Sequence, residues 1–143
     1  MDPVLVTARR DQALQSVGFA QRQKSGFGHY VTAEEIARRN PIYLSDILRT
    51  VPGLKEISVN GQSDIASSRG TGSLTGGACV NYVVDGMRWQ STSPGDVNDF
   101  VNPREVAGIE VYQPSETPGE FMDAGMRACT TIVIWTKFKV GTH

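Results

Sequence analysis

Residues 79–86, Cys-Val-Asn-Tyr-Val-Val-Asp-Gly, constrain the fold of this chain more than any other stretch. Val80 to Val84 are β-branched, aromatic or apolar except for one asparagine, which favours a strand, and Asp85-Gly86 is a dipeptide typical of tight turns. Two later segments, Ile109 to Tyr112 and Cys129 to Thr136, have the same character. Short, largely apolar strands cover each other best as neighbours, so we predict that all three belong to one sheet.

Two short helices are predicted before the central strand. Thr32 to Glu35 has the form of a capping box and indicates a helix that ends at Asn40-Pro41. A second helix is indicated by an apolar stripe at positions i, i+3, i+4 and i+7, which are Leu44, Ile47, Leu48 and Val51. Pro52-Gly53 ends this helix. We expect its stripe to pack on one face of the sheet.

Glycine-rich segments separate these helices from the central strand. Residues 61–77 contain five glycines among small polar residues, and residues 89–95 form a second loop. Ile57 and Val59 alternate with polar residues as in an edge strand, and a further strand is expected at Ile65 to Arg69. Glycine-rich loops bury little, so we expect residues 61–77 to be mobile without a partner. Candidate ligand contacts on and beside these loops are Asn60, Gln62, Asp64, Arg69, Ser73 and Trp89.

Composition and motifs exclude several functions. Fourteen basic and fifteen acidic residues give a formal net charge of −1, so the chain lacks the positive field that nucleic-acid binding needs. There is no apolar run of 18 residues, and the start lacks a signal-peptide pattern, as would a chain whose signal had been removed. A nucleophile elbow, a Walker A loop and paired metal-binding histidines are missing. We therefore predict no enzyme activity, no cofactor and no metal.

The two cysteines, Cys79 and Cys129, lie at or just before the start of a predicted strand. Such equivalent placement on two strands of a small sheet would allow a cross-strand disulfide, which would close a loop of about 50 residues. The alternative is a pair of buried thiols in a reducing compartment.

Several motifs, taken in their order, resemble a known family. They are Leu44 to Leu48 with Val51 to Leu54, then Ser68-Arg69-Gly70, Tyr82 to Gly86, Ile109-Glu110-Val111 and Ile132 to Lys137. In order and spacing these motifs resemble the plug domain of TonB-dependent outer-membrane receptors. The resemblance implies an α+β fold with a small mixed β-sheet, short helices and long glycine-rich loops. In those receptors the plug lies inside a barrel of about 22 strands.

The resemblance also implies a domain organisation. Residues 1–29 would be an extended N-terminal arm, residues 30–137 the plug-like domain, and residues 138–143 a C-terminal tail. The arm contains a segment similar to the TonB box that couples such receptors to energy, with residues Asp2, Val4, Leu5, Val6 and Thr7. A linker to an upstream module is an equal alternative for this arm.

Residue roles follow from the same resemblance. Asp85-Gly86 would form the turn at the strand end, Arg69-Gly70 would be a structural motif, and Arg69 and Glu110 would be charges that can contact a barrel wall. Because the family belongs to an oxidising compartment, Cys79 and Cys129 are expected to be bonded.

The expected partners are the TonB periplasmic domain, a β-barrel in cis, and an unknown small ligand or protein, in the periplasm or outer membrane of the bacterial envelope. The chain looks most similar to plug-only relatives that follow a carboxypeptidase-regulatory-like domain and have no barrel. Two functions are therefore open: a gating or ligand-recognition module of an outer-membrane transporter, and a free-standing periplasmic binding module.

Overall fold

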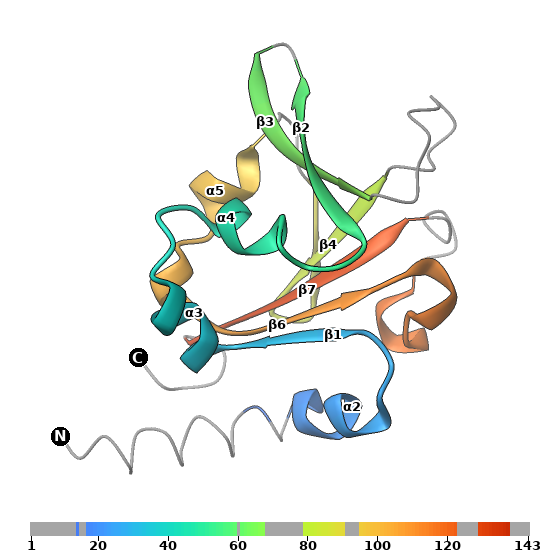
Figure 1. The fold of residues 1–143 in the computed structure, drawn as a ribbon. Helices are drawn as coiled ribbons and strands as arrows, with labels where there is room; N and C mark the ends of the chain where they lie inside the picture. Colours follow the sequence, from blue (N-terminus) through green and yellow to red (C-terminus); the bar gives the residue numbers. More distant parts are fainter. Residues whose placement is uncertain are drawn as a thin grey trace, which may run out of the picture.

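A five-stranded mixed sheet is the centre of the domain (Figure 1). The computed structural model describes residues 14, 17–59, 61–67, 79–90, 95–122 and 129–137. The strand order is β1 (His29–Thr32), β6 (Val106–Tyr112), β7 (Thr130–Thr136), β4 (Val80–Val84) and β5 (Met87–Trp89). Strand β6 is antiparallel to both β1 and β7, whereas β4 and β7 are parallel. The fold is thus α+β with a small mixed sheet, as the sequence predicts.

The three strands predicted from their apolar character, β4, β6 and β7, are neighbours at the middle of this sheet. Strand β7 is the central one, and its Ile132, Val133 and Ile134 have no exposed surface. A strand covered on both faces has a nearly continuous apolar sequence, which explains the Ile-Val-Ile-Trp run. Alternate residues of β7 enter two separate hydrophobic clusters, one on each face of the sheet.

Helix α3 (Ala33–Arg39) begins and ends where its sequence signals predict. The Thr32 hydroxyl oxygen accepts a hydrogen bond from the Glu35 backbone N–H at 3.2 Å. At the other end Asn40 takes a left-handed conformation with φ of 49°, which closes the helix before Pro41. The predicted capping box is confirmed in its N-cap contact.

The predicted apolar stripe of helix α4 (Leu44–Leu48) packs in the larger hydrophobic cluster. It contacts α5 (Asp96–Phe100) through a reciprocal pair: Ser45 N–H donates to Asn98 Oδ1 at 2.9 Å, and Asn98 Nδ2 donates to the Ser45 hydroxyl at 3.0 Å. Figure 1 shows α3, α4 and α5 on one side of the sheet and α2 (Phe19–Ser25) on the other. Among the described residues, three α-helices therefore cover one face of the sheet and one α-helix covers the other.

The predicted extended arm, residues 1–29, contains a helix in its last third. Residues 19–25 form helix α2, and the Phe19 ring is only 2% exposed. Phe19 lies against Gly108, where a Cβ atom would come within 2.9 Å of its ring. The ordered domain thus includes residues before the predicted boundary at Tyr30. Phe27, which follows α2, is 62% exposed.

A separate two-stranded sheet is formed by β2 (Leu54–Val59) and β3 (Gln62–Ser67), and β3 lies within the segment that is expected to be mobile. The two strands pair antiparallel along their whole length, from Leu54 opposite Ser67 to Val59 opposite Gln62. The strands expected around Ile57 and Val59 and from Ile65 onward are therefore present as β2 and β3. Residues 68–77 lie outside the described part, and the mobility of residues 61–77 stays a prediction. Short 3₁₀ turns complete the fold at Pro103–Glu105, Pro114–Glu116 and Gly119–Phe121.

Among the described residues, no helix has the length and hydrophobicity needed to cross a bilayer.

Candidate functional site

The turn after β4 reverses the chain into β5, and its Asp85 side chain also binds the end of β7. Asp85 and Gly86 have φ angles of 54° and 86°, the left-handed pair that a two-residue hairpin between β4 and β5 requires. The Asp85 carboxylate accepts hydrogen bonds from the Thr136 backbone N–H at 2.8 Å and from the Thr136 hydroxyl at 2.7 Å. Asp85 therefore fixes the end of β7 beside β4, a role that a turn motif alone does not predict.

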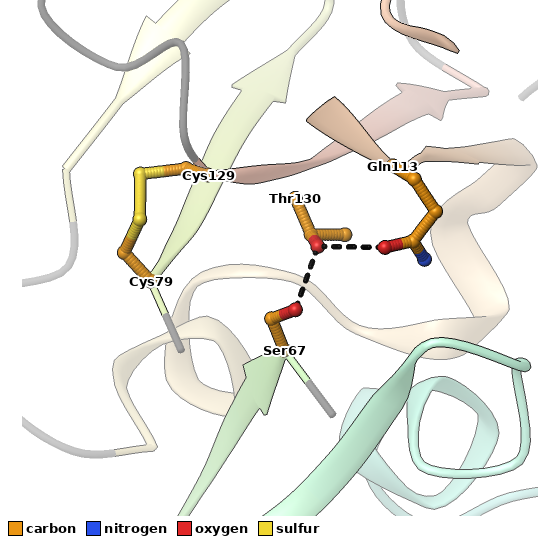
Figure 2. The surroundings of a disulfide bond; sticks show 5 residues. All are labelled: Ser67, Cys79, Gln113, Cys129 and Thr130. Atoms are coloured by element: carbon orange, nitrogen blue, oxygen red, sulfur yellow. Dashed lines mark hydrogen bonds between the residues drawn. A yellow bond between two sulfur atoms is a disulfide. The ribbon is translucent and has the colours of Figure 1, made fainter. Parts of the chain in front are cut away.

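The opposite ends of the same two strands are joined covalently. Cys79 and Cys129 form a disulfide, and the Thr130 backbone N–H donates to the Cys79 carbonyl at 3.1 Å (Figure 2). The Thr130 hydroxyl lies 3.0 Å from the Ser67 hydroxyl and 3.4 Å from Gln113 Oε1. This corner thus connects β3, β4, β7 and the end of β6, and the predicted disulfide is confirmed.

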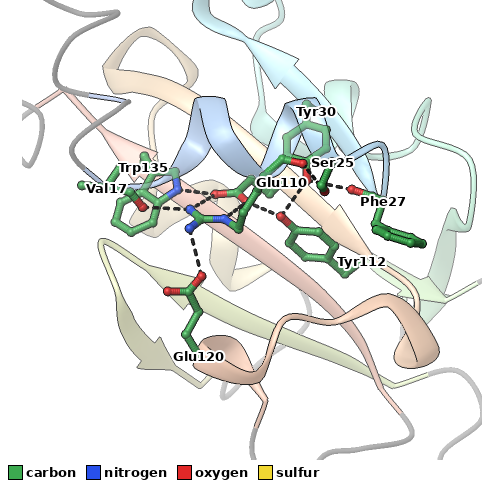
Figure 3. Close-up of polar contacts among 9 residues, drawn as sticks. Val17, Ser25, Phe27, Tyr30, Glu110, Tyr112, Glu120 and Trp135 are labelled. Atoms are coloured by element: carbon green, nitrogen blue, oxygen red, sulfur yellow. Dashed lines mark hydrogen bonds and ion pairs between the residues drawn. The ribbon is translucent and has the colours of Figure 1, made fainter.

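Glu110 lies in the interior, under helix α2. Its side chain is 0% exposed, and Figure 3 shows its carboxylate between Tyr112 and Trp135. Trp135 Nε1 donates to Oε2 at 2.6 Å, and the Tyr112 hydroxyl donates to Oε1. Burial, followed by this hydrogen bond, raises the pKa of Tyr112, so the phenol keeps its proton and remains a donor. Glu110 is therefore buried and paired within the domain, and its expected contact with a barrel wall stays a prediction.

Arg22 supplies the charge that compensates Glu110. Its Nε and Nη2 donate to the two carboxylate oxygens at 2.7 and 2.8 Å, a bidentate ion pair. Burial acts to lower the pKa of Arg22, but the hydrogen bond and the negative charge of Glu110 outweigh it, and the pKa is raised above its ordinary value. A buried carboxylate is tolerated only when it is paired in this way.

An aromatic platform lies at the surface on the other side of the sheet. The Trp89 and Phe100 rings stack with centroids 4.9 Å apart, and Tyr82 contacts Trp89 edge-on at 5.4 Å. Phe100 is 55% exposed and does not point inward as a core residue would. Trp89 and Phe100 line an open cavity of about 320 Å³ together with Gln90, Asp96 and Asp99.

The other predicted ligand contacts are dispersed. Asp64 Oδ1 accepts from the backbone N–H groups of Ile65 and Gly95, at 3.0 and 3.3 Å, and so positions the start of α5. Gln62 is exposed at the tip of the β2–β3 hairpin. The remaining candidates lie outside the described residues: Asn60, Arg69, Gly70, Ser73 and the TonB-box-like residues Asp2, Val4, Leu5, Val6 and Thr7. In the described ranges no three His, Cys, Asp or Glu side chains gather as they would around a metal ion.

Sequence reasoning missed three groups that build these sites: Arg22, Trp135 and Phe100. One signal was present, because a glutamate inside an otherwise apolar strand often indicates a buried, paired charge. Nothing local indicates its partner, since Arg22 lies 88 residues away.

Comparisons with known proteins agree with this architecture. The family model of the TonB-dependent Receptor Plug Domain matches residues 21–119. A mutant of the ferric enterobactin receptor PfeA from Pseudomonas aeruginosa is 28% identical, with a TM-score of 0.61, over 81% of this chain and 18% of the receptor. Another PfeA mutant, in complex with enterobactin, is 30% identical, with a TM-score of 0.57, over 76% of this chain and 17% of the receptor.

The RagAB peptide importer in its open-open state shares the fold, with 23% identity and a TM-score of 0.53 over 76% of this chain and 12% of that protein. A comparison with curated protein sequences found no significant match. The chain therefore corresponds to less than a fifth of the length of these solved structures.

Proposed function

Because the chain belongs to the TonB-dependent receptor plug domain family, we propose that it is the plug-like module of an envelope protein and gates transport across the bacterial outer membrane. The observation that carries this proposal is the match of the family model over residues 21–119. Similarity at 28–30% identity to the plug region of a ferric enterobactin receptor supports it. Such plugs act in transport receptors and are not enzymes.

The fold is suited to a domain that blocks a pore and must not deform while it does so. Both ends of the β4–β7 pair are fixed, by Asp85 at one end and by the disulfide at the other. Large apolar side chains remain on the outside, among them Ile42, Tyr43 and Met87. Exposed apolar side chains of this size suit an enclosing protein surface, and we assign that surface to a β-barrel in cis.

Gating is tested with the full-length protein in planar lipid bilayers. Deleting residues 30–137 should raise the conductance of each channel well above that of the intact protein, because the plug no longer occludes the lumen. The intact protein with Arg38→Ala, a change at an exposed position, should conduct as the unmodified protein does. Equal conductance with and without residues 30–137, or no channel in either case, would overturn the proposal.

For the arm, we propose strand addition onto the TonB periplasmic domain. Val4 to Thr7 are four β-prone residues in a row, and an extended terminal segment binds well at a partner's sheet edge. Val6→Pro removes one backbone donor and fixes φ, so it should abolish the binding heat measured by titration calorimetry.

The matched control for this change is Val6→Thr, which keeps both the donor and the β-propensity and should bind nearly as well. If the unmodified chain does not bind, or if the proline variant binds equally, the arm is a linker between modules.

A free-standing binding module is the second candidate, and the Trp89–Phe100 platform favours it. A stacked aromatic pair beside two carboxylates and an open cavity is suited to recognising a small molecule or a peptide. The two candidates differ in one respect: such a module binds its ligand as an isolated domain, without a barrel around it.

A further inference from the structure

We propose that Glu110 and the aromatic side chains around it form a guanidinium-binding site, and that Arg22 occupies this site in cis, which makes α2 a releasable latch on the sheet. The inference concerns the domain alone and goes beyond its proposed role in gating.

The receiving side of the site is supplied by side chains of the sheet. Glu110 is fixed on β6, with Trp135 Nε1 donating to one carboxylate oxygen at 2.6 Å and the Tyr112 hydroxyl donating to the other. The Tyr112 hydroxyl is itself within 2.9 Å of the Tyr30 hydroxyl. Each carboxylate oxygen therefore has one donor from the sheet and accepts a second from the guanidinium. The site presents a parallel pair of acceptors, which a planar guanidinium matches and an ammonium does not.

The guanidinium is also held from its other sides. Arg22 Nη1 donates to Glu120 Oε1 at 2.9 Å, and Nη2 donates to the Val17 carbonyl at 3.0 Å. The centre of the guanidinium lies 4.8 Å from the centroid of the Phe121 ring, the geometry of a cation–π contact. Carboxylates on two sides and an aromatic face are the groups expected of a site selective for arginine.

Helix α2 depends on this contact because it has few others. It has seven residues, no side-chain cap at Gly18, and basic but no acidic residues at its ends. An isolated helix shorter than about 12 residues is marginal in water, so α2 is held by its tertiary anchors. These are Phe19, which packs on Gly108, and Arg22. Gly26, just after the helix, is in the left-handed region, with space around its Cα, and can serve as a hinge.

Glu110 and Arg22 each need the other to remain buried, so the loss of either one should release α2. If Arg22 is lost, the buried Glu110 carboxylate loses its counter-charge, and movement of α2 away from the sheet lets water replace it. If Glu110 is neutralised, Arg22 loses its main partner and is better solvated outside. Either single change should therefore release α2, while the sheet below keeps its own hydrophobic cluster on the opposite face.

The test is chemical rescue of Arg22→Ala in the full 143-residue chain, followed by amide hydrogen exchange. The substitution should speed exchange across residues 19–25 by about 100-fold or more, while residues 132–134 of β7 keep their protection. Millimolar ethylguanidinium should restore slow exchange in α2 by filling the vacated site. Ethylammonium, with the same charge and a similar alkyl group, should not.

Two further variants keep the test decisive if Arg22→Ala folds poorly. Glu110→Gln should also release α2, but ethylguanidinium should not restore it, because the charged acceptor is gone. Arg39→Ala is the matched control, since Arg39 pairs with Glu35 at the exposed surface and its loss should leave α2 unchanged. Equal effects of the two alkyl cations, joint loss of protection in α2 and β7, or no change in α2 would each overturn the proposal. None of these outcomes depends on a barrel, so they are independent of the gating experiment.

Discussion

Removing the disulfide by Cys79→Ala with Cys129→Ala is expected to lower the free energy of unfolding by about 4 kcal/mol. The bond joins residues 50 apart in sequence, and in the chain-entropy model a loop of that length restricts the unfolded chain strongly. Urea unfolding of the oxidised protein and the variant measures the difference directly. The melting temperature should fall by roughly 10–15 °C.

Reduction of the unmodified protein is the control for that change, because it breaks the same bond without altering the side chains around it. It should lower the free energy of unfolding by a similar amount, and the denatured, unreduced protein should show no free thiol. A loss below about 1 kcal/mol would mean that loop closure contributes little here, and free thiols in the oxidised protein would contradict the bond itself.

Leu48→Ala should destabilise the domain by about 3 kcal/mol. Leu48 is 0% exposed in the larger hydrophobic cluster, so truncation leaves a cavity that its neighbours cannot fill completely. The matched control is Ile42→Ala, because Ile42 lies on the same α3–α4 region but is 79% exposed, and its truncation should cost less than about 0.5 kcal/mol. Chemical denaturation of both variants gives the comparison, and similar losses would show that α4 is not packed as described.

The elements that could be predicted from the sequence each have a local signal. Helix α3 has its hydroxyl N-cap, α4 has its apolar stripe, and β4 and β7 have runs of β-branched residues. Helix α2 has none of these: its sequence, Phe-Ala-Gln-Arg-Gln-Lys-Ser, is mostly polar and shows no clean period. Its position depends on two side chains that pack on the sheet, which is tertiary information.

The buried position of Glu110 could not be predicted from the sequence, for a definite physical reason. In Ile-Glu-Val-Tyr, alternation correctly places Glu110 and Tyr112 on the same face of β6, opposite Ile109 and Val111. What the pattern could not show is that a distant helix covers the face and brings a matching cation to it. The sequence likewise does not show that the Phe100 ring stacks on Trp89 at the surface, because these two residues belong to different elements.

The position of β7 determines when the sheet can form. It lies between β6 and β4, and it is the last strand of the described chain to be synthesised. Without β7, the five-stranded sheet would be left as two strand pairs, β1 with β6 and β4 with β5, with no strand pairing between them. Because the parallel β4–β7 pairing joins residues 50 apart, its formation requires closing a long loop, and such contacts form slowly. The sheet is therefore completed after synthesis of its C-terminal strand, and not progressively from the N-terminus.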